Sequence, residues 1–293
     1  MRDANGPAGP LWDTLQATRR GVNKALNQDR CRVAGTGTAG DPLVLAVADG
    51  HGSAAHARSH VGAQYAVEVF AEKAREFGRL ARAAGDGEVR PSLGWLMHYA
   101  QDSLPRRLVG AWQRKALRHW ERFPCGDASR PDAEKLRLYG STLVGAVLTP
   151  ELFAAWQLGD GELAVVEEDG ALWLPLAPGE AELGDETESL CSTQQAWQLV
   201  RTYWAPITDP SRTPRLITLS TDGLSKSFAA GEGFSAFVTG LDQRLAESGA
   251  AEVRAALPEW LAEASRHSGD DTTLVAARRN PPYRGSADTK PTE

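Results

Sequence analysis

The sequence predicts an α+β fold with largely antiparallel sheets. Strand-like segments follow one another in runs, and so do helix-like segments, whereas strict alternation of the two would indicate a parallel sheet. Short turn signals such as Asp169-Gly170 separate neighbouring strands, which is typical of hairpins. At 293 residues the chain is long enough to bury a sizeable core. We expect a single domain over residues 11–278, with loose termini at 1–10 and 279–293.

The N-terminal part is expected to begin with a hairpin and to continue as a long helix. Strands over 30–36 and 42–48 are joined by a turn that contains glycine and aspartate. The second strand is almost entirely apolar, so it should be buried and should end directly before Asp49. Ser53 is a suitable N-cap, and apolar residues then recur every four positions. This pattern predicts a helix from 53 to about 77.

A second helical region is predicted over 92–123. Pro105 should break it, because proline lacks the backbone N–H that a helix interior requires. Apolar side chains at helical spacing predict a stripe that faces the core. This stripe consists of Trp95, Leu96, Tyr99, Leu104, Leu108, Trp112 and Leu117.

The C-terminal half combines further strands with two helices. The predicted strands cover 142–148, 152–158, 162–167, 171–174, 215–220 and 272–277, and the predicted helices cover 233–247 and 251–267. Gly269 is suited to end the second helix in the left-handed conformation. The acidic segment 177–188 contains glycine and proline, so we expect a surface loop near the entrance of a site.

Charge and composition narrow the class of protein. The net charge of −6 argues against nucleic acid or an anionic membrane as the main partner. No apolar stretch approaches the roughly 20 residues of a membrane-spanning helix, and the N-terminus lacks a hydrophobic signal core. We therefore expect a cytoplasmic protein. Cys31, Cys125 and Cys191 are odd in number and widely spaced, which indicates reduced thiols and no disulfide framework.

Short acidic motifs carry the chemical information. They are Asn27-Gln28-Asp29, Asp49-Gly50-His51-Gly52, Gly159-Asp160-Gly161, Thr221-Asp222-Gly223 and Gly269-Asp270-Asp271. Taken alone, each is equally typical of a tight turn. Several follow strands directly, so a fold that gathers strand ends would bring their carboxylates together, where they repel unless a cation lies between them. Oxygen ligands with no cysteine and one histidine suit Mg²⁺ or Mn²⁺ better than zinc.

The order of these motifs, with Gly140-Ser141-Thr142 and Asp270-Asp271-Thr272-Thr273 added, resembles the PP2C-type (PPM) metal-dependent protein serine/threonine phosphatases, and in particular their bacterial branch. The resemblance extends from about Thr18 to Ala277. Because the motifs run from position 27 to 273, a cut anywhere would split the site, which favours one domain. The resemblance implies a four-layer αββα sandwich with metals at one end of two packed sheets.

The resemblance also implies a reaction, which is hydrolysis of phosphoserine and phosphothreonine in proteins. The attacking water would be activated between two Mn²⁺ or Mg²⁺ ions, with a third ion at a more labile site, and no phosphoenzyme would form. His51 would protonate the leaving oxygen. The implied metal residues are Asp49, which bridges both ions, the Gly50 carbonyl, Asp222, Asp270, and Asp160 for the third ion.

The chain departs from the family pattern at two positions. Gln28 stands where many members have glutamate, so it offers a neutral oxygen ligand at best, and Asp29 could hold that metal through water. Lys24 stands where an arginine for the substrate phosphate is expected, and an ammonium is a point charge without the guanidinium fork. Arg19 or Arg20 could supply that fork, and both are equally readable as solvated strand residues.

The roles of three further motif residues follow from the same comparison. Asp271 stands where many members have asparagine, so it could bind a metal or hydrogen-bond Asp270. Ser141 and Thr142 are expected to serve strand packing.

Three functional hypotheses follow. The first is a metal-dependent phosphoprotein phosphatase whose partners are a phosphorylated protein and its cognate serine/threonine kinase. The alternative is a catalytically weak phosphatase-like module that binds a phosphoprotein or kinase partner, which Gln28 and Lys24 would favour. The third is a divalent-ion sensor, which would have no use for His51.

Overall fold

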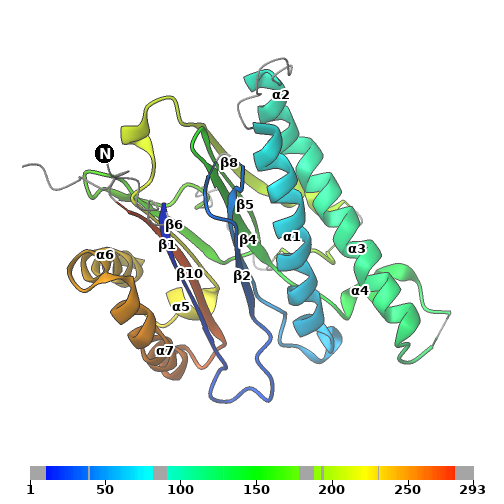
Figure 1. Ribbon diagram of the computed structural model, residues 1–293. Coiled ribbons are helices and arrows are strands. Elements are labelled where there is room, and N and C mark those ends of the chain that lie inside the picture. The colour runs from blue at the N-terminus through cyan, green and yellow to red at the C-terminus, as the bar shows by residue number, and fades with distance from the viewer. Residues whose placement is uncertain are drawn as a thin grey trace, which may run out of the picture.

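The computed structural model describes residues 11–38, 40–81, 91–127, 129–177, 188–192, 195–229 and 231–280. Two five-stranded sheets pack face to face, and helices cover the outer face of each sheet (Figure 1). The predicted α+β fold, a four-layer αββα sandwich, is therefore confirmed. Most of the predicted acidic loop, from 178 to 187, lies outside the described residues.

The first sheet has the strand order β1-β10-β9-β6-β7, and each neighbouring pair is antiparallel. Its strands are β1 (Trp12–Arg19), β10 (Thr272–Arg279), β9 (Leu216–Ser220), β6 (Glu162–Val166) and β7 (Leu172–Trp173). The sequence did not predict β1, which pairs with β10 along its whole length. The expected loose C-terminus begins too early at 279, because Arg279 still pairs with Trp12.

The second sheet has the order β2-β3-β4-β5-β8 and is also antiparallel throughout. Its strands are β2 (Arg30–Ala34), β3 (Leu43–Ala48), β4 (Leu143–Thr149), β5 (Leu152–Leu158) and β8 (Arg201–Pro206). Every residue of β3, β4 and β5 is buried, since these strands are covered on both faces. The sequence did not predict β8, which lies at the edge.

The helices form two groups, one on each outer face. The first group is α1 (Ser59–Ala81), α2 (Leu93–His98), α3 (Leu104–Arg122) and α4 (Asp132–Arg137), and the second is α5 (Asp222–Ser225), α6 (Gly231–Glu247) and α7 (Gly249–Ser268). Short 3-10 turns cover Ala54–His56, Ala196–Leu199 and Pro210–Arg212. Gly269 ends α7 in the left-handed conformation, with φ of 75°, as predicted. No helix of the described ranges is long and apolar enough to cross a membrane.

Two details of the predicted helices were wrong. Ser53 makes no side-chain cap bond and precedes only a 3-10 turn. The first long helix begins at Ser59 because the Arg58 N–H donates to the Leu138 carbonyl (2.8 Å), which ties the preceding segment to another part of the chain. Pro105 does not break the second helix. It lies in the first turn of α3, where proline is tolerated, after a π-helical segment over Tyr99–Ser103.

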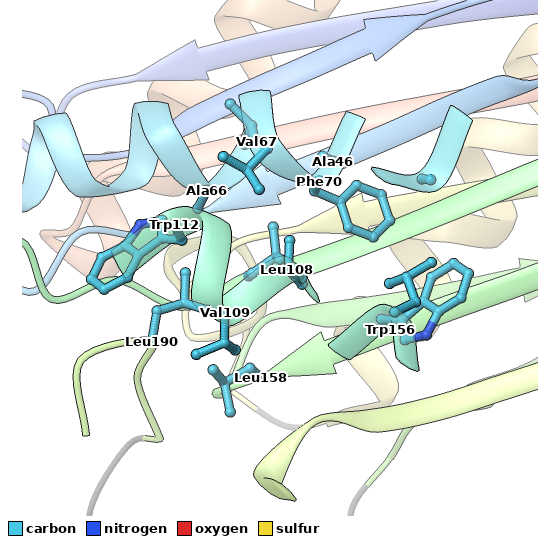
Figure 2. Close-up of a cluster of buried hydrophobic side chains, with 14 of the residues drawn as sticks. Ala46, Ala66, Val67, Phe70, Leu108, Val109, Trp112, Trp156, Leu158 and Leu190 are labelled. Carbon is cyan, nitrogen blue, oxygen red and sulfur yellow. The ribbon is translucent and has the colours of Figure 1, made fainter. Parts of the chain in front are cut away.

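Three apolar cores hold the four layers together. The first lies between α1, α3 and the second sheet, where Phe70, Trp112 and Trp156 are fully buried (Figure 2). The second core fills the space between the sheets, and the third lies between the first sheet and α6 and α7. The predicted core stripe is buried or half-buried except at Trp95, which is 45% exposed because it lies near the start of the short α2.

Candidate active site

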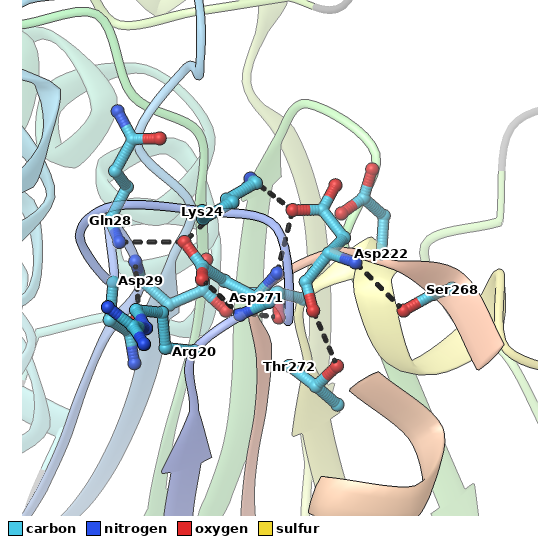
Figure 3. Close-up of polar contacts among 12 residues, drawn as sticks. Arg20, Lys24, Gln28, Asp29, Asp222, Ser268, Asp271 and Thr272 are labelled. Carbon is cyan, nitrogen blue, oxygen red and sulfur yellow. Dashed lines mark hydrogen bonds and ion pairs between the residues drawn. The ribbon is translucent and has the colours of Figure 1, made fainter. Parts of the chain in front are cut away.

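Carboxylates from both sheets meet at one end of the sandwich. Asp49 follows β3, Asp222 follows β9 and opens α5, and Asp29 directly precedes β2. Asp270 and Asp271 directly precede β10. Figure 3 shows Asp29, Asp222 and Asp271 in this cluster with Lys24 beside them. The predicted gathering of Asp29, Asp49, Asp222 and Asp270 is thus what the fold produces.

Asp29 lies at the bottom of this cluster and is only 1% exposed. Its Oδ2 accepts a hydrogen bond of 2.7 Å from the Thr221 hydroxyl, which in turn accepts from the Thr273 N–H at 3.0 Å. Its Oδ1 is buried and has no hydrogen-bond partner among the described residues. Burial, together with the charges of Asp271 and Asp222, raises the pKa of Asp29 to about 7 despite the hydroxyl contacts.

Asp49 and Asp222 lie in the same cluster as Asp29. Burial raises the pKa of Asp49 well above its ordinary value, and the carboxylates of Asp29, Asp222 and Asp270 raise it further. Asp222 is 6% exposed, and its Oδ1 is a second buried oxygen that has no partner in the described part of the chain. Buried acceptors that lack a donor are costly, and a hard cation would satisfy both oxygens. The donor types of these residues therefore suit a divalent metal.

Both carboxylate oxygens of Asp271 accept hydrogen bonds from backbone N–H groups. It accepts hydrogen bonds from the N–H groups of Gly21 (2.8 Å) and Gln28 (2.7 Å), and its own N–H donates to Asp270 Oδ1 (2.7 Å). These bonds fix the N-terminal loop against the start of β10. The hydrogen bond to Asp270 that the sequence left open is made by the backbone N–H of Asp271, and the alternative role of Asp271 as a metal ligand stays a prediction.

Lys24 reaches the same carboxylates. Its ammonium forms an ion pair with Asp270 and lies 3.7 Å from Asp271 Oδ2. Burial disfavours its charge, but the hydrogen bond to Asp270 and the charges of Asp270, Asp271 and Asp49 outweigh this and raise the pKa of Lys24. Arg19 and Arg20 instead donate to the carbonyls of neighbouring loops and helices, at Pro258 (2.9 Å) and Ala25 (3.0 Å).

Gln28 lies beside the motif that carries Asp49. Its amide nitrogen donates to the His51 carbonyl (3.0 Å) and to the Ser59 hydroxyl (2.5 Å). The amide oxygen is therefore the atom through which Gln28 could bind a metal. Asp49 itself is held by Thr142, whose hydroxyl accepts from the Asp49 N–H at 3.1 Å and whose N–H donates to the Asp49 carbonyl at 2.8 Å.

His51 borders both the carboxylate cluster and an open cavity of about 770 Å³. Its ring lies 4.8 Å from that of His56, whose Nδ1 is 2.5 Å from the Arg137 carbonyl. Burial and the neighbouring His56 lower the pKa of His51 to about 4, although Asp222 opposes the shift. The described cavity lining is His51, Gly52, Ser53, His56, Ala133, Glu134, Arg137, Ser189, Cys191 and Ser192.

The glycines of the Asp-Gly pairs allow close approach of the chain segments. A Cβ on Gly223 would lie 1.9 Å from the Asp271 carbonyl oxygen and 3.3 Å from Asp270 Cβ. A Cβ on Gly50 would lie 2.7 Å from the Ser59 carbonyl carbon. Glycine at these positions lets the strand ends pack directly against the neighbouring motifs, which a simple turn would not require.

Asp160 lies at the edge of the cluster, next to residues that the sequence analysis did not single out. Lys226 forms an ion pair with Asp222 and lies 3.9 Å from Asp160 Oδ2. Glu162 also lies near Asp160 and Asp222. Burial raises its pKa to about 7, and the charges of these two aspartates contribute to the shift. The spacing of Lys226 could have identified it in the sequence, because a residue four positions after Asp222 lies on the same face of a helix.

The carboxylates are not arranged as a finished metal site. Across the described ranges, no group of three histidine, cysteine, aspartate or glutamate side chains could hold a metal ion as it stands. Lys24 and Lys226 instead partner Asp270 and Asp222. The carboxylates that meet here are of the ligand type that divalent metals prefer. In this structure two lysine ammonium groups balance part of their negative charge.

The two-sheet sandwich matches solved structures of bacterial serine/threonine phosphatases. A bacterial serine phosphatase matches with a TM-score of 0.57 and 14% identity, covering 92% of this chain and 98% of that chain. The catalytic domain of the serine/threonine phosphatase PstP, in complex with two manganese ions, matches with a TM-score of 0.55 and 18% identity, covering 91% and 97%. Stp1 from Staphylococcus aureus matches with 0.55 and 13%, covering 96% and 100%.

The family is shown by the sequence itself. The family model described as protein phosphatase 2C matches residues 18–262, which is most of the chain. The chain therefore belongs to the protein phosphatase 2C family, a family of protein serine/threonine phosphatases. A comparison with curated protein sequences gives no match.

Proposed function

We propose that this chain hydrolyses phosphoserine and phosphothreonine in proteins and that it needs Mn²⁺ or Mg²⁺ to do so. Family membership supports phosphatase activity. The metal requirement is supported by the two buried carboxylate oxygens, on Asp29 and Asp222, that have no partner among the described residues. A phosphorylated protein and its cognate kinase would be the partners.

The metal-holding residues in this proposal are Asp49, the Gly50 carbonyl, Asp222, Asp270, Asp29 and Gln28. Asp160, at the edge, is the residue that a third ion would use. Bound divalent cations would lower the pKa of a water molecule and neutralise charge on the phosphate. The protein's own contribution is to hold Asp49 in place through Thr142. Thr221 does the same for Asp29.

His51 is the proposed proton donor to the leaving oxygen. Its lowered pKa means that the free site holds it mostly neutral at pH 7. A phosphate dianion beside the ring would raise this pKa, because an opposite charge favours the charged imidazolium. Protonation would therefore accompany substrate binding.

Lys24 is the proposed contact for the substrate phosphate. Its ammonium is paired with Asp270, so it becomes available for the substrate when Asp270 serves as a ligand. Arg19 and Arg20 are weaker candidates because both guanidinium groups donate to carbonyls elsewhere.

The test is hydrolysis of a phosphoserine peptide by the full chain, measured as phosphate release with Mn²⁺ and with a chelator. We expect turnover only with Mn²⁺ and a loss of at least a hundredfold in Asp49→Asn and Asp222→Asn. Asp102→Asn, in the exposed i,i+4 ion pair with Arg106, is the matched control and should retain activity. Full activity of Asp49→Asn in chelator would refute the proposal.

The second candidate, a phosphatase-like binding module, is favoured by one observation. Lys24 and Gln28, the two departures from the family pattern, both make contacts within the site. The same assay separates the candidates. Peptide binding without phosphate release at any Mn²⁺ concentration would identify the module.

A further inference from the structure

The chain uses lysine sparingly, yet two lysines lie at the carboxylate cluster. It contains 26 arginines and six lysines. Lys24 pairs with Asp270 on one side, and Lys226 pairs with Asp222 on the other. Arginine is planar and binds carboxylates through a fork, whereas an ammonium is a compact point charge with three donors. At these two positions the chain has the cation that most resembles a small metal ion in shape.

Lys226 lies near two carboxylates that are far apart in the sequence. It follows the first residue of α5 by one helical turn, and its ammonium forms an ion pair with Asp222 at the end of β9. Asp160 Oδ2, from the loop after β5, lies 3.9 Å away. Glu162 lies close to this pair, and its carboxyl interacts with both aspartates.

A cation between two aspartates relieves the repulsion of their carboxylates, as a divalent ion in the same place would. Two carboxylates that share one cation would repel each other without it. A lysine ammonium is charged at neutral pH, and Lys226 cannot diffuse away because it is part of the chain, directly after α5. A divalent ion at this place would have to displace the ammonium and then tolerate its charge nearby.

We propose that Lys226 is a tethered cation that occupies the place between Asp160 and Asp222, so that the site binds one divalent ion fewer than its carboxylates would otherwise allow. This inference rests on the proposed metal-dependent function and specifies how many ions that function uses. It makes Lys226 a residue that determines metal stoichiometry.

The experiment counts bound Mn²⁺ by electron paramagnetic resonance of free Mn²⁺ during titration of the full chain. Lys226→Gln should bind one more Mn²⁺ per chain than wild type, or bind its weakest Mn²⁺ at least tenfold more tightly. Lys226→Arg keeps the charge and should retain the wild-type stoichiometry. Lys115→Gln, which removes an ammonium paired with Glu68 far from the cluster, is the matched control and should leave the titration unchanged.

A second variant locates the additional ion. Asp160→Asn introduced into the Lys226→Gln background should abolish the additional Mn²⁺ and restore the wild-type count. Thermal unfolding gives an independent reading, because Lys226→Gln leaves Asp222 without its ammonium. The melting temperature of this variant in chelator should fall, and Mn²⁺ should raise it by more than in wild type.

Each outcome is decisive. Equal Mn²⁺ counts and affinities in wild type and Lys226→Gln, with wild-type turnover intact, would overturn the inference and leave the proposed function standing. A raised KM for phosphopeptide with an unchanged Mn²⁺ titration would also overturn it and make Lys226 a substrate contact. No Mn²⁺ bound by either protein would overturn the inference together with the proposed function.

Discussion

Two carboxylate oxygens in the acidic cluster destabilise the folded chain because they are buried without a hydrogen-bond donor among the described residues. Asp29 and Asp222 each keep one buried oxygen without a partner in the described chain. An unsatisfied buried acceptor costs roughly 1–3 kcal/mol, and the two lie within one site. Such a cost is expected where a ligand completes the contacts, so these two oxygens mark the residues whose environment should change most when a divalent ion is added.

His51 gives a prediction at the residue scale that separates an acid from a metal ligand. A serine alkoxide needs a proton as the P–O bond breaks, whereas p-nitrophenolate leaves readily without one. We therefore expect His51→Ala to lower the kcat for a phosphoserine peptide at least tenfold more than the kcat for p-nitrophenyl phosphate. The control is His267→Ala, an exposed residue on α7. Equal losses on both substrates that excess Mn²⁺ restores would place His51 among the metal ligands.

Gln28 gives a second prediction, in which stability and metal affinity move in opposite directions. A glutamate here cannot donate to the His51 carbonyl as the amide does, so Gln28→Glu should lower the melting temperature in chelator. Its added charge should also lower, several-fold, the Mn²⁺ concentration that gives half-maximal activity.

The matched control for this substitution is Gln16→Glu, at an exposed position of β1. An unchanged Mn²⁺ requirement in Gln28→Glu would mean that residue 28 does not contact the metal.

At the scale of elements, the short connection between β9 and α5 sets how the strand ends approach each other. Gly223→Ala should destabilise the protein by a few kcal/mol, since its Cβ would overlap the Asp271 carbonyl. It should also weaken Mn²⁺ binding, because Asp222 would shift. Gly240→Ala is the control, as its Cβ meets nothing within 4 Å in α6, and alanine should stabilise that helix by up to about 1 kcal/mol. Thermal unfolding and Mn²⁺ titration of both variants check this, and equal melting temperatures would contradict it.

The elements also show what the sequence could and could not predict. The buried strands β3, β4 and β5 and the motifs at their ends were predicted because these apolar runs are short and are bounded by turn residues. β1 and β8 were missed because they are half-exposed strands in which polar residues interrupt the apolar alternation. Their edge position alone is not the reason, since the edge strands β2 and β7 were predicted. The close approach of Gly223 to the Asp271 backbone could not be predicted either, because an Asp-Gly pair is equally typical of an ordinary turn. Lys226 was missed because its i,i+4 spacing from Asp222 is also typical of an ordinary exposed ion pair, and its second neighbour, Asp160, is distant in sequence.

At the scale of the whole molecule, the buried carboxyl of Asp29 links stability to pH. Its pKa is raised from 3.8 to about 7, so the metal-free folded state binds more protons than the unfolded state between these values. The contribution of Asp29 to stability is therefore fully present below about pH 4 and is lost as the pH rises through 7. In chelator, the melting temperature of wild type minus that of Asp29→Asn should fall between pH 5 and pH 8.

Two comparisons test the source of this pH dependence. Asp209→Asn should give a flat difference over the same range, because hydrogen bonds from Ser211 lower the pKa of Asp209 and its titration lies at lower pH. Saturating Mn²⁺ should abolish the fall in wild type by keeping the carboxylate charged. A difference that rises with pH would show that Asp29 is stabilised as an anion without metal.

Asp49 extends from the second sheet and Asp222 from the first, so a divalent ion that binds both would connect the two halves of the sandwich. A ligand that binds only the folded chain at a hundred times its dissociation constant adds about 2.7 kcal/mol of stability. Separation of the sheets at this end would then require loss of the ion first. Scarcity of Mn²⁺ would shorten the survival of the chain against proteases as well as stop its turnover, and cells would lose the enzyme itself when the metal runs low.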